Sequence, residues 1–434
     1  MADKLSPKQR FIVSATVIGN ALEWFDFTLF ALMAPLITKI FFPERASSVL
    51  YLVLMFVVVA IARPLGGVVF GYIGDRTGRK SALFETIVLM TIPIFLIAVL
   101  PSYEKIGISA TIGLAFILIF QGFSLGGEFP GTLVFLSESS SQKMKGYMGS
   151  WSYFGIFLGM FFAATDFYLL NTEMPLSDLE DWGWRLPFFI GGVVGIVSIF
   201  LRRLLRETPF FQEAKQFGYL VKEPILYALH KYKKMILQGI GIFILDTVGF
   251  NLILIFSSSY LQSVIGLSSQ ESFQINLFTI AVLLVCTPLM GKLSIRIGTK
   301  RMARWAALGM LLAAFPAFLC MGLSGFGSAL ICQGVLAFLL AGYLSNLPAL
   351  ICSLFPVEVR YSGTSLAINL AIGVFGALGP LIMSYVIIEL KMPILSAIYL
   401  SLGAAIALFT LSTMKENGEP LQKQIVNDRS EKPN

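Results

Sequence analysis

The chain has 434 residues, of which 56% are hydrophobic and 13% charged, with a mean hydropathy of +0.80. These values are far from those of soluble domains, so we expect an integral membrane protein. The net charge of +7 alone would allow a nucleic-acid partner, but the cations are segregated by loop, which argues against one. The four cysteines lie in apolar runs without metal-ligand spacing, so neither a disulfide framework nor a metal site is expected.

The chain contains twelve apolar runs, most of them about the ~20 residues needed to cross a bilayer. They fall at 12–42, 49–73, 82–100, 109–136, 148–170, 185–203, 234–262, 272–293, 302–322, 326–352, 362–389 and 392–414. We therefore predict an all-α membrane protein with twelve transmembrane helices in two pseudo-symmetric six-helix bundles. The predicted divisions are an N-terminal bundle at 1–203, a linker at 204–233, a C-terminal bundle at 234–414 and a disordered tail at 415–434.

The loops that share a side with the two termini carry 26 of the 32 lysines and arginines, whereas the opposite loops carry five. The positive-inside rule then places both termini and the linker in the cytoplasm. In the linker, apolar residues recur at helical spacing and predict an amphipathic helix on the membrane surface: Phe210, Phe211, Ala214, Phe217 and Leu220.

A polar hinge, Gly71 to Lys80, separates the second and third runs and returns 220 residues later as Gly291 to Lys300. The repeat indicates two halves of the same topology, although Ser294 and Ile295 replace Gly74 and Asp75 in the second copy. We expect Asp75 to accept hydrogen bonds from a neighbouring helix N-terminus. We predict that the hinge charges and their candidate partners close a cytoplasmic gate; these residues are Asp75, Arg76, Arg79, Glu138, Arg296, Glu358 and Arg360. The alternative is that the hinge charges only orient the chain in the membrane.

The hinge, together with the segments 19–27, 62–67, 121–128, 206–211 and 355–361, resembles the major facilitator superfamily and, within it, the metabolite:proton symporter family. Members of that family carry proline and betaine, 2-oxoglutarate, citrate or shikimate. The resemblance implies a multi-pass transporter of the inner (cytoplasmic) membrane of a bacterium. We expect it to need no cofactor, to act as a monomer and to have a small-molecule substrate, protons and the lipid bilayer as its partners.

Ionisable groups inside a bilayer are costly and mark functional sites. Glu23 and Asp26 share one face of the first helix with Asn20, and Arg63 and Glu128 fall at similar depths on other helices. In a low-dielectric cavity the free-energy cost of charging three acids that face one base is high. Either one carboxylate takes up a proton or a cation lies among them. Proton coupling is predicted for Glu128 first, and for Asp26 or Glu23 second. The alternative is a permanent ion pair between Arg63 and Glu23 or Asp26.

Polar and aromatic residues at membrane depth are candidates for substrate binding: Asn20, Arg63, Trp24, Trp151, Tyr153, Asp246, Asn251, Asn346 and Asn369. Aromatic faces attract quaternary ammonium groups, although such residues are more often core or lipid-facing. The asparagines could instead join helices. The family usually has an arginine where this chain has Leu118, which favours a zwitterion or monocarboxylate over a tri-anion.

We therefore predict proton-coupled uptake, by alternating access, of a small zwitterionic metabolite or osmolyte (proline, betaine or another amino acid) or of a monocarboxylate. The alternatives are a dicarboxylate:proton symporter, a facilitator or efflux carrier, and a membrane-embedded sensor. An enzyme is not expected, because the only histidine, His230, lies in the linker and no nucleophile lies beside a base.

Overall fold

A computed structural model describes residues 5–42, 48–322, 325–376 and 392–414, together with 379, 383 and 385; for 48–56 it describes the backbone alone. Within these residues every regular element is a helix. The first half comprises α1 Pro7–Leu32, α2 Ala34–Phe41, α3 Ser48–Arg76, α4 Arg79–Val99, α5 Tyr103–Ile106, α6 Ile108–Glu138, η1 Gln142–Met144, α7 Lys145–Glu173, α8 Leu176–Asp178, η2 Leu179–Gly183 and α9 Arg185–Arg203.

The connecting segment holds two short helices, α10 Pro209–Gln216 and α11 Pro224–Lys231. The second half comprises α12 Lys233–Phe250, η3 Asn251–Ile255, α13 Ser257–Ser263, α14 Ser269–Ile297, α15 Thr299–Met321, α16 Phe326–Leu344, α17 Leu347–Leu354, η4 Val357–Val359, α18 Arg360–Ala371, η5 Ile372–Gly376 and α20 Leu395–Thr413.

Local chemistry explains several helix boundaries. Ser6 and Gln9 form a capping box at the start of α1, and Ser268 with Glu271 repeats it at the start of α14. Gly78 separates α3 from α4 at a φ of 139°, and Gly298 separates α14 from α15 at a φ of 94°. Glycine reaches such angles without a Cβ clash, so the two copies of the hinge turn at equivalent glycines.

Ten helices in the described residues are long and apolar enough to cross a membrane, and the number is eleven if α1 and α2, bent by 72°, are counted as one span. The predicted run at 362–389 begins as α18 and η5, and most of the remainder lies outside the described residues, as does the predicted tail at 415–434. The all-helical, multi-span architecture is thus the predicted one.

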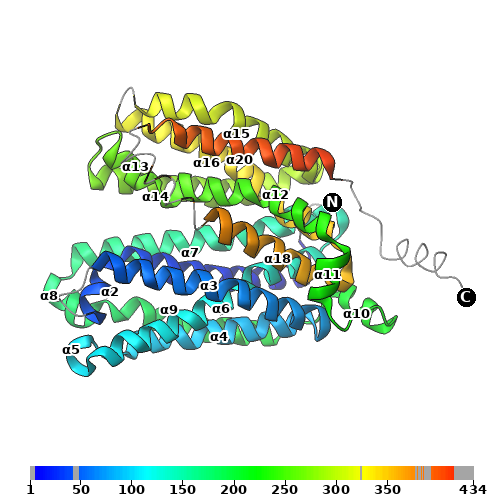
Figure 1. Cartoon of the computed structure of the whole chain (residues 1–434), viewed down its shortest axis with the longest axis horizontal. Coiled ribbons are helices and arrows are strands. Elements are labelled where there is room, and N and C mark those ends of the chain that lie inside the picture. The colour runs from blue at the N-terminus through cyan, green and yellow to red at the C-terminus, as the bar shows by residue number, and fades with distance from the viewer. Residues whose placement is uncertain are drawn as a thin grey trace, which may run out of the picture.

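The helices of each half pack mainly against one another (Figure 1). In the first half α1 packs on α7, and α6 packs on α3 and α4; in the second, α15 packs on α16 and α20. The halves meet where α7 lies along α14 and where α18 lies along α3 and α6. Helices α10 and α11 cover one end of the molecule, where α20 also ends; we call this the linker end (Figure 1).

Candidate functional site: a charged cluster at the linker end and polar groups at membrane depth

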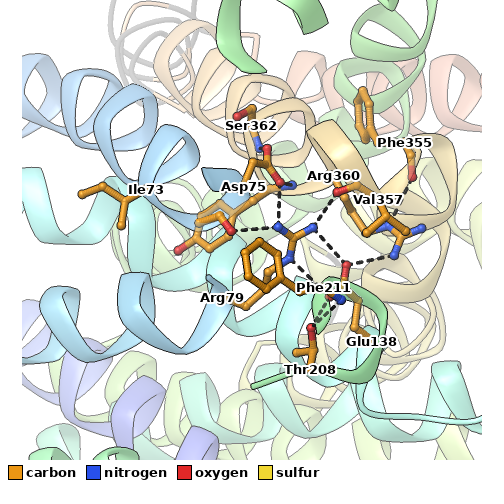
Figure 2. Close-up of polar contacts among 12 residues, drawn as sticks. Ile73, Asp75, Arg79, Glu138, Thr208, Phe211, Phe355, Val357, Arg360 and Ser362 are labelled. Atoms are coloured by element: carbon orange, nitrogen blue, oxygen red, sulfur yellow. Dashed lines mark hydrogen bonds and ion pairs between the residues drawn. The ribbon is translucent and has the colours of Figure 1, made fainter. Parts of the chain in front are cut away.

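A buried cluster of charges joins the two halves at the linker end (Figure 2). We define the linker-end cluster as Asp75, Arg79, Glu138 and Arg360. Arg79 lies 3.0 Å from Asp75 and 3.2 Å from Glu138, and Glu138 also binds Arg360 of the second half at 2.9 Å. Arg79 donates as well to the Val357 carbonyl, at 2.6 Å across the interface. The side chains of Arg79 and Glu138 have no exposed surface, so their charges are compensated by one another.

Asp75 accepts hydrogen bonds from the backbone N–H groups of Tyr361 at 3.0 Å and Ser362 at 2.8 Å. These donors belong to the first turn of α18, so a carboxylate of the first half caps a helix of the second. This is the kind of partner that the sequence predicts for Asp75. The close approach requires Gly74, because a Cβ there would overlap the Tyr361 ring.

The other hinge charges lie outside this cluster. Arg76 is exposed and donates to the Tyr72 hydroxyl and the Lys222 carbonyl. Arg296 is exposed as well. Glu358 accepts a 3.2 Å hydrogen bond from the Tyr232 hydroxyl. Of the two acids expected to pair with hinge cations, Glu138 and Glu358, only Glu138 does so among the described contacts.

The connecting segment closes over the linker-end cluster. Thr208 donates to Glu138 at 2.6 Å, the Phe211 ring lies 5.0 Å from the Arg79 guanidinium, and the Phe210 ring lies 5.6 Å from that of Arg360. Glu207 accepts a 3.2 Å hydrogen bond from the backbone N–H of Lys80, a residue in the first turn of α4. Burial raises the pKa of the Glu207 carboxyl.

A second buried ion pair lies at membrane depth. Both oxygens of Glu128 bind the guanidinium of Arg202, from the last turn of α9, and Thr86 donates to the same carboxylate at 2.6 Å. The sequence places Arg202 with the cytoplasmic cations and predicts Arg63 as the single base that faces the buried acids. That prediction is wrong, because Arg202 is fully buried and is a second base. The neighbouring Arg203 is exposed, because adjacent residues of a helix lie on different faces.

The acids on α1 differ in their partners. Gln121 donates to Asp26 at 2.6 Å, and Asn20 donates to the Ser152 carbonyl at 3.0 Å. Neither oxygen of Glu23 has a hydrogen-bond partner among the described residues, although the residue is only 1% exposed. Glu23 and Asp26 line a cavity within the first half, and Leu118 lines it too.

Arg63 forms no ion pair with Glu23 or Asp26 within the described part of the chain. Its Nε instead donates to the Asn369 side-chain oxygen, 3.3 Å away on α18. The alternative of a permanent ion pair between Arg63 and an acid of the first helix is therefore wrong for this conformation. Arg63 and Asn369, predicted separately as substrate ligands, bind each other across the interface.

Several predicted ligands meet where α1, α7 and α12 converge. Tyr153 donates to Asp246 at 2.9 Å, and the Trp24 ring lies 4.8 Å from the Phe250 ring, centroid to centroid. Phe157 stacks on Phe250 at 6.4 Å. A carboxylate beside aromatic faces is the chemistry that accommodates a substituted ammonium group. We call Trp24, Tyr153, Phe157, Asp246 and Phe250 the interface aromatic site.

The remaining three candidates lie elsewhere. Trp151 packs on Tyr147 and Phe154 within the first half. Asn251 begins the π-helical segment η3, and its side chain donates to the Thr247 carbonyl at 2.9 Å. Asn346 sits at the break between α16 and α17 and donates to the Gly342 carbonyl at 3.0 Å. The structure thus brings Trp24, Tyr153 and Asp246 together and leaves Trp151 and Asn346 apart from them.

Two helical halves that meet over polar groups at membrane depth, with one end closed by charges shared between them, define a membrane transport protein of the major facilitator fold. Solved structures agree with that fold. The xylose:proton symporter XylE bound to 6-bromo-6-deoxy-D-glucose gives a TM-score of 0.79 at 17% identity, over 96% of this chain and 98% of that one. The Escherichia coli fucose:proton symporter FucP gives 0.70 at 10% identity, over 94% and 98%.

The sequence matches the family described as "Sugar (and other) transporter" over residues 12–218 and 221–424, and the chain belongs to that family. It is 34% identical over 422 residues to the proline/betaine transporter of Escherichia coli K12, covering 94% of this chain and 84% of the relative. It is 33% identical over 426 residues to the glycine betaine/proline/ectoine/pipecolic acid transporter OusA of Dickeya dadantii, covering 95% and 85%. The chain is therefore a multi-pass transporter of the major facilitator superfamily.

Proposed function

We propose that the chain takes up a small zwitterion, proline or a betaine, with protons across a bacterial inner membrane. The observation that carries this proposal is the interface aromatic site, which places the Asp246 carboxylate and the Trp24, Phe157 and Phe250 rings at the contact between the halves. The similar transporters are named for proline and betaine, zwitterions whose charges suit such a site.

The two ends of a zwitterion need opposite partners. A secondary or quaternary ammonium group would lie on the aromatic rings near Asp246 and displace the Tyr153 hydroxyl. The carboxylate would reach Arg63, whose guanidinium can bind a carboxylate with two parallel hydrogen bonds. Asn369 would line the space between these ends, whereas Trp151, Asn251 and Asn346 have other neighbours.

The linker-end cluster supports alternating access. Its contacts join the halves, so they must break when the halves part at that end and re-form when they close. We propose that this end faces the cytoplasm, with both termini there, and that the rigid units are residues 1–203 and 234–414, joined by 204–233. We also propose that one copy of the chain is sufficient for transport.

Glu23 and Asp26 are better placed than Glu128 to carry the coupled proton. Glu128 is bound at both oxygens by Arg202, and protonating it would leave that buried guanidinium without its charged partner. Glu23 has no such partner among the described residues, so its neutral form avoids the cost of a bare buried charge.

Uptake into proteoliposomes tests the proposal. Labelled proline, glycine betaine, branched amino acids, 2-oxoglutarate, citrate and shikimate are each supplied with and without an inward proton gradient. We expect the gradient to drive accumulation of a zwitterion in the wild type. Glu23→Gln should abolish accumulation and keep exchange of internal for external substrate. Accumulation of citrate or equilibration that ignores the gradient would contradict the substrate class or the coupling.

A further inference from the structure

The hydrogen bond between Arg63 and Asn369 crosses the two halves of the protein. Asn369 holds its amide in place by donating to the Gly126 carbonyl at 2.9 Å and to the Ser365 carbonyl at 2.9 Å, which directs its oxygen to Arg63. Asn369 lies on α18, the helix that Asp75 caps in the linker-end cluster. The bond therefore depends on α18 lying against α3 and α6, as it does while the linker end is closed.

Glu23 is an acid for which Arg63 is a suitable partner. The charged and titratable groups around it are Asp26 on its own helix, Arg63 on α3, Glu128 on α6 and Arg202 on α9. Arg202 is committed to Glu128 and to the Leu83 carbonyl. Arg63 makes one hydrogen bond among the described residues, to a neutral amide.

Arg63 is also within reach of the Glu23 cavity. Val59, one helical turn before Arg63, lines the same cavity as Glu23. On α6 the cavity is lined by Leu118, Gln121 and Leu125, which carry no charge. On the other side of Arg63, Asp246 of α12 is within electrostatic range, but it already accepts from Tyr153 of α7.

We propose that Arg63 is a positioning residue that couples proton release to opening of the linker end. This inference rests on the proposed proton-coupled transport. While α3 and α18 are together, Asn369 holds Arg63, and Glu23 keeps its proton. When the halves part, Arg63 loses Asn369 and turns to Glu23. The O–H bond of Glu23 then breaks, its proton passes to water in the opened cavity, and the carboxylate forms an ion pair with the guanidinium.

The order of events follows from the geometry. The proton is released on the side that opens, because Arg63 is free only when that side is open. Return of α18 to α3 restores the Asn369 bond and leaves Glu23 without a counter-ion, ready to bind a proton from the other side. In this coupling Arg63 is the group that changes partner, from Asn369 of the second half to Glu23 of the first.

Infrared titration of the protein in lipid bilayers tests this inference without a substrate. The protonated-carboxyl band of Glu23 is identified by its loss in Glu23→Gln, and its pH midpoint is then measured in wild type, Asn369→Ala and Asn369→Leu. Leucine keeps the approximate volume of asparagine but has no oxygen to accept from Arg63. Both variants release Arg63 in the closed state, so the midpoint should move to lower pH by about one unit.

Ser365→Ala is the matched control. Ser365 lies one turn before Asn369 and donates to the Gly67 carbonyl across the same interface. Its hydroxyl also accepts from the Asn369 amide at 3.2 Å, but in Ser365→Ala that amide keeps its bonds to the Gly126 and Ser365 carbonyls and so still directs its oxygen to Arg63. The midpoint of Ser365→Ala should equal that of the wild type. In proteoliposomes the Asn369 variants should lose gradient-driven accumulation at the wild-type optimum by roughly ten-fold, whereas Ser365→Ala should keep it.

A midpoint that is the same in wild type and both Asn369 variants would overturn the role of Arg63, as would an equal shift in Ser365→Ala. Because the titration needs no transported compound, failure of every substrate in the uptake panel would count against the proposed function alone.

Discussion

Asp75 and Ser362 are 287 positions apart in the chain, yet the carboxylate of one accepts a 2.8 Å hydrogen bond from the backbone N–H of the other. The bond links the last turn of α3 to the first turn of α18, so it joins the two halves at the linker end. Because the acceptor is a carboxylate and the donor a helix N-terminus, both charge and dipole favour the closed arrangement.

Asp75→Asn should shift the protein toward a state open at the linker end. The substitution keeps the side-chain shape and removes the charge that binds Arg79 and the first turn of α18. Losing a charge-assisted hydrogen bond of about 1.5–3 kcal/mol corresponds to roughly a ten-fold or larger change in the ratio of open to closed protein.

The shift can be measured by electron paramagnetic resonance between spin labels at Thr77 and Arg296, exposed residues of the first and second halves. The labels are introduced after replacement of the four cysteines. Asp75→Asn should increase the population of long distances, and Lys292→Ala, an exposed change beyond the cluster, should not. Equal distance distributions for wild type and Asp75→Asn would rule out the locking role of Asp75.

Glu138→Gln should destabilise the protein far more than Glu358→Gln. The first change leaves the buried Arg79 without its second carboxylate and removes the partner of Arg360, at a cost of roughly 3–5 kcal/mol for breaking a buried pair. The second removes a half-buried acid whose described bond is to the Tyr232 hydroxyl at 3.2 Å. Thermal unfolding in detergent measures the difference, and similar melting temperatures for the two variants would show that the cluster does not stabilise the fold.

Gly19→Ala should disrupt the ion pair between Arg202 and Glu128. A Cβ at Gly19 would overlap the Arg202 guanidinium, which is enclosed by α1, α4 and α6. We expect loss of transport with a lower melting temperature. Gly327→Ala is the control: a Cβ there meets nothing within 4 Å, so the same change should be neutral or stabilise α16 by about 0.5–1 kcal/mol.

Tyr153→Phe should alter substrate affinity more than stability. The phenylalanine keeps the ring beside Phe129 and removes the hydroxyl that donates to Asp246. Because no hydroxyl has to be displaced, an ammonium group has freer access to the Asp246 carboxylate. The KM for the zwitterion should therefore fall several-fold, which corresponds to a gain of roughly 1 kcal/mol in binding free energy. Tyr399→Phe, which loses only a 3.5 Å bond to the Phe375 carbonyl, is the control and should leave the KM unchanged.

Glu207 makes stability depend on pH. Burial raises the pKa of its carboxyl, so the folded protein binds this proton more tightly than the unfolded chain does. Its contribution to stability is therefore complete below the unfolded pKa and is lost as pH rises through the raised folded pKa. Melting temperatures measured across that range should fall less in Glu207→Gln than in wild type, and parallel profiles would contradict the assignment.

The sequence by itself determined the membrane class, the helical spans and the two-fold repeat, because each depends on local properties: runs of apolar residues, their length and the spacing of the hinge glycines. It also indicated that Asp75 can accept hydrogen bonds from the N-terminus of a neighbouring helix.

Only the tertiary structure decided how the buried charges pair. Glu128 binds Arg202, a residue that its position at a helix end had assigned to the cytoplasmic loops, and Arg63 binds Asn369 rather than an acid of α1. These partners come from helices that are far apart in the chain. Helical periodicity shows which residues share a face of one helix, but the facing helix and its rotation follow from packing, here from glycines such as Gly19 and Gly74 that allow a guanidinium or a ring to approach.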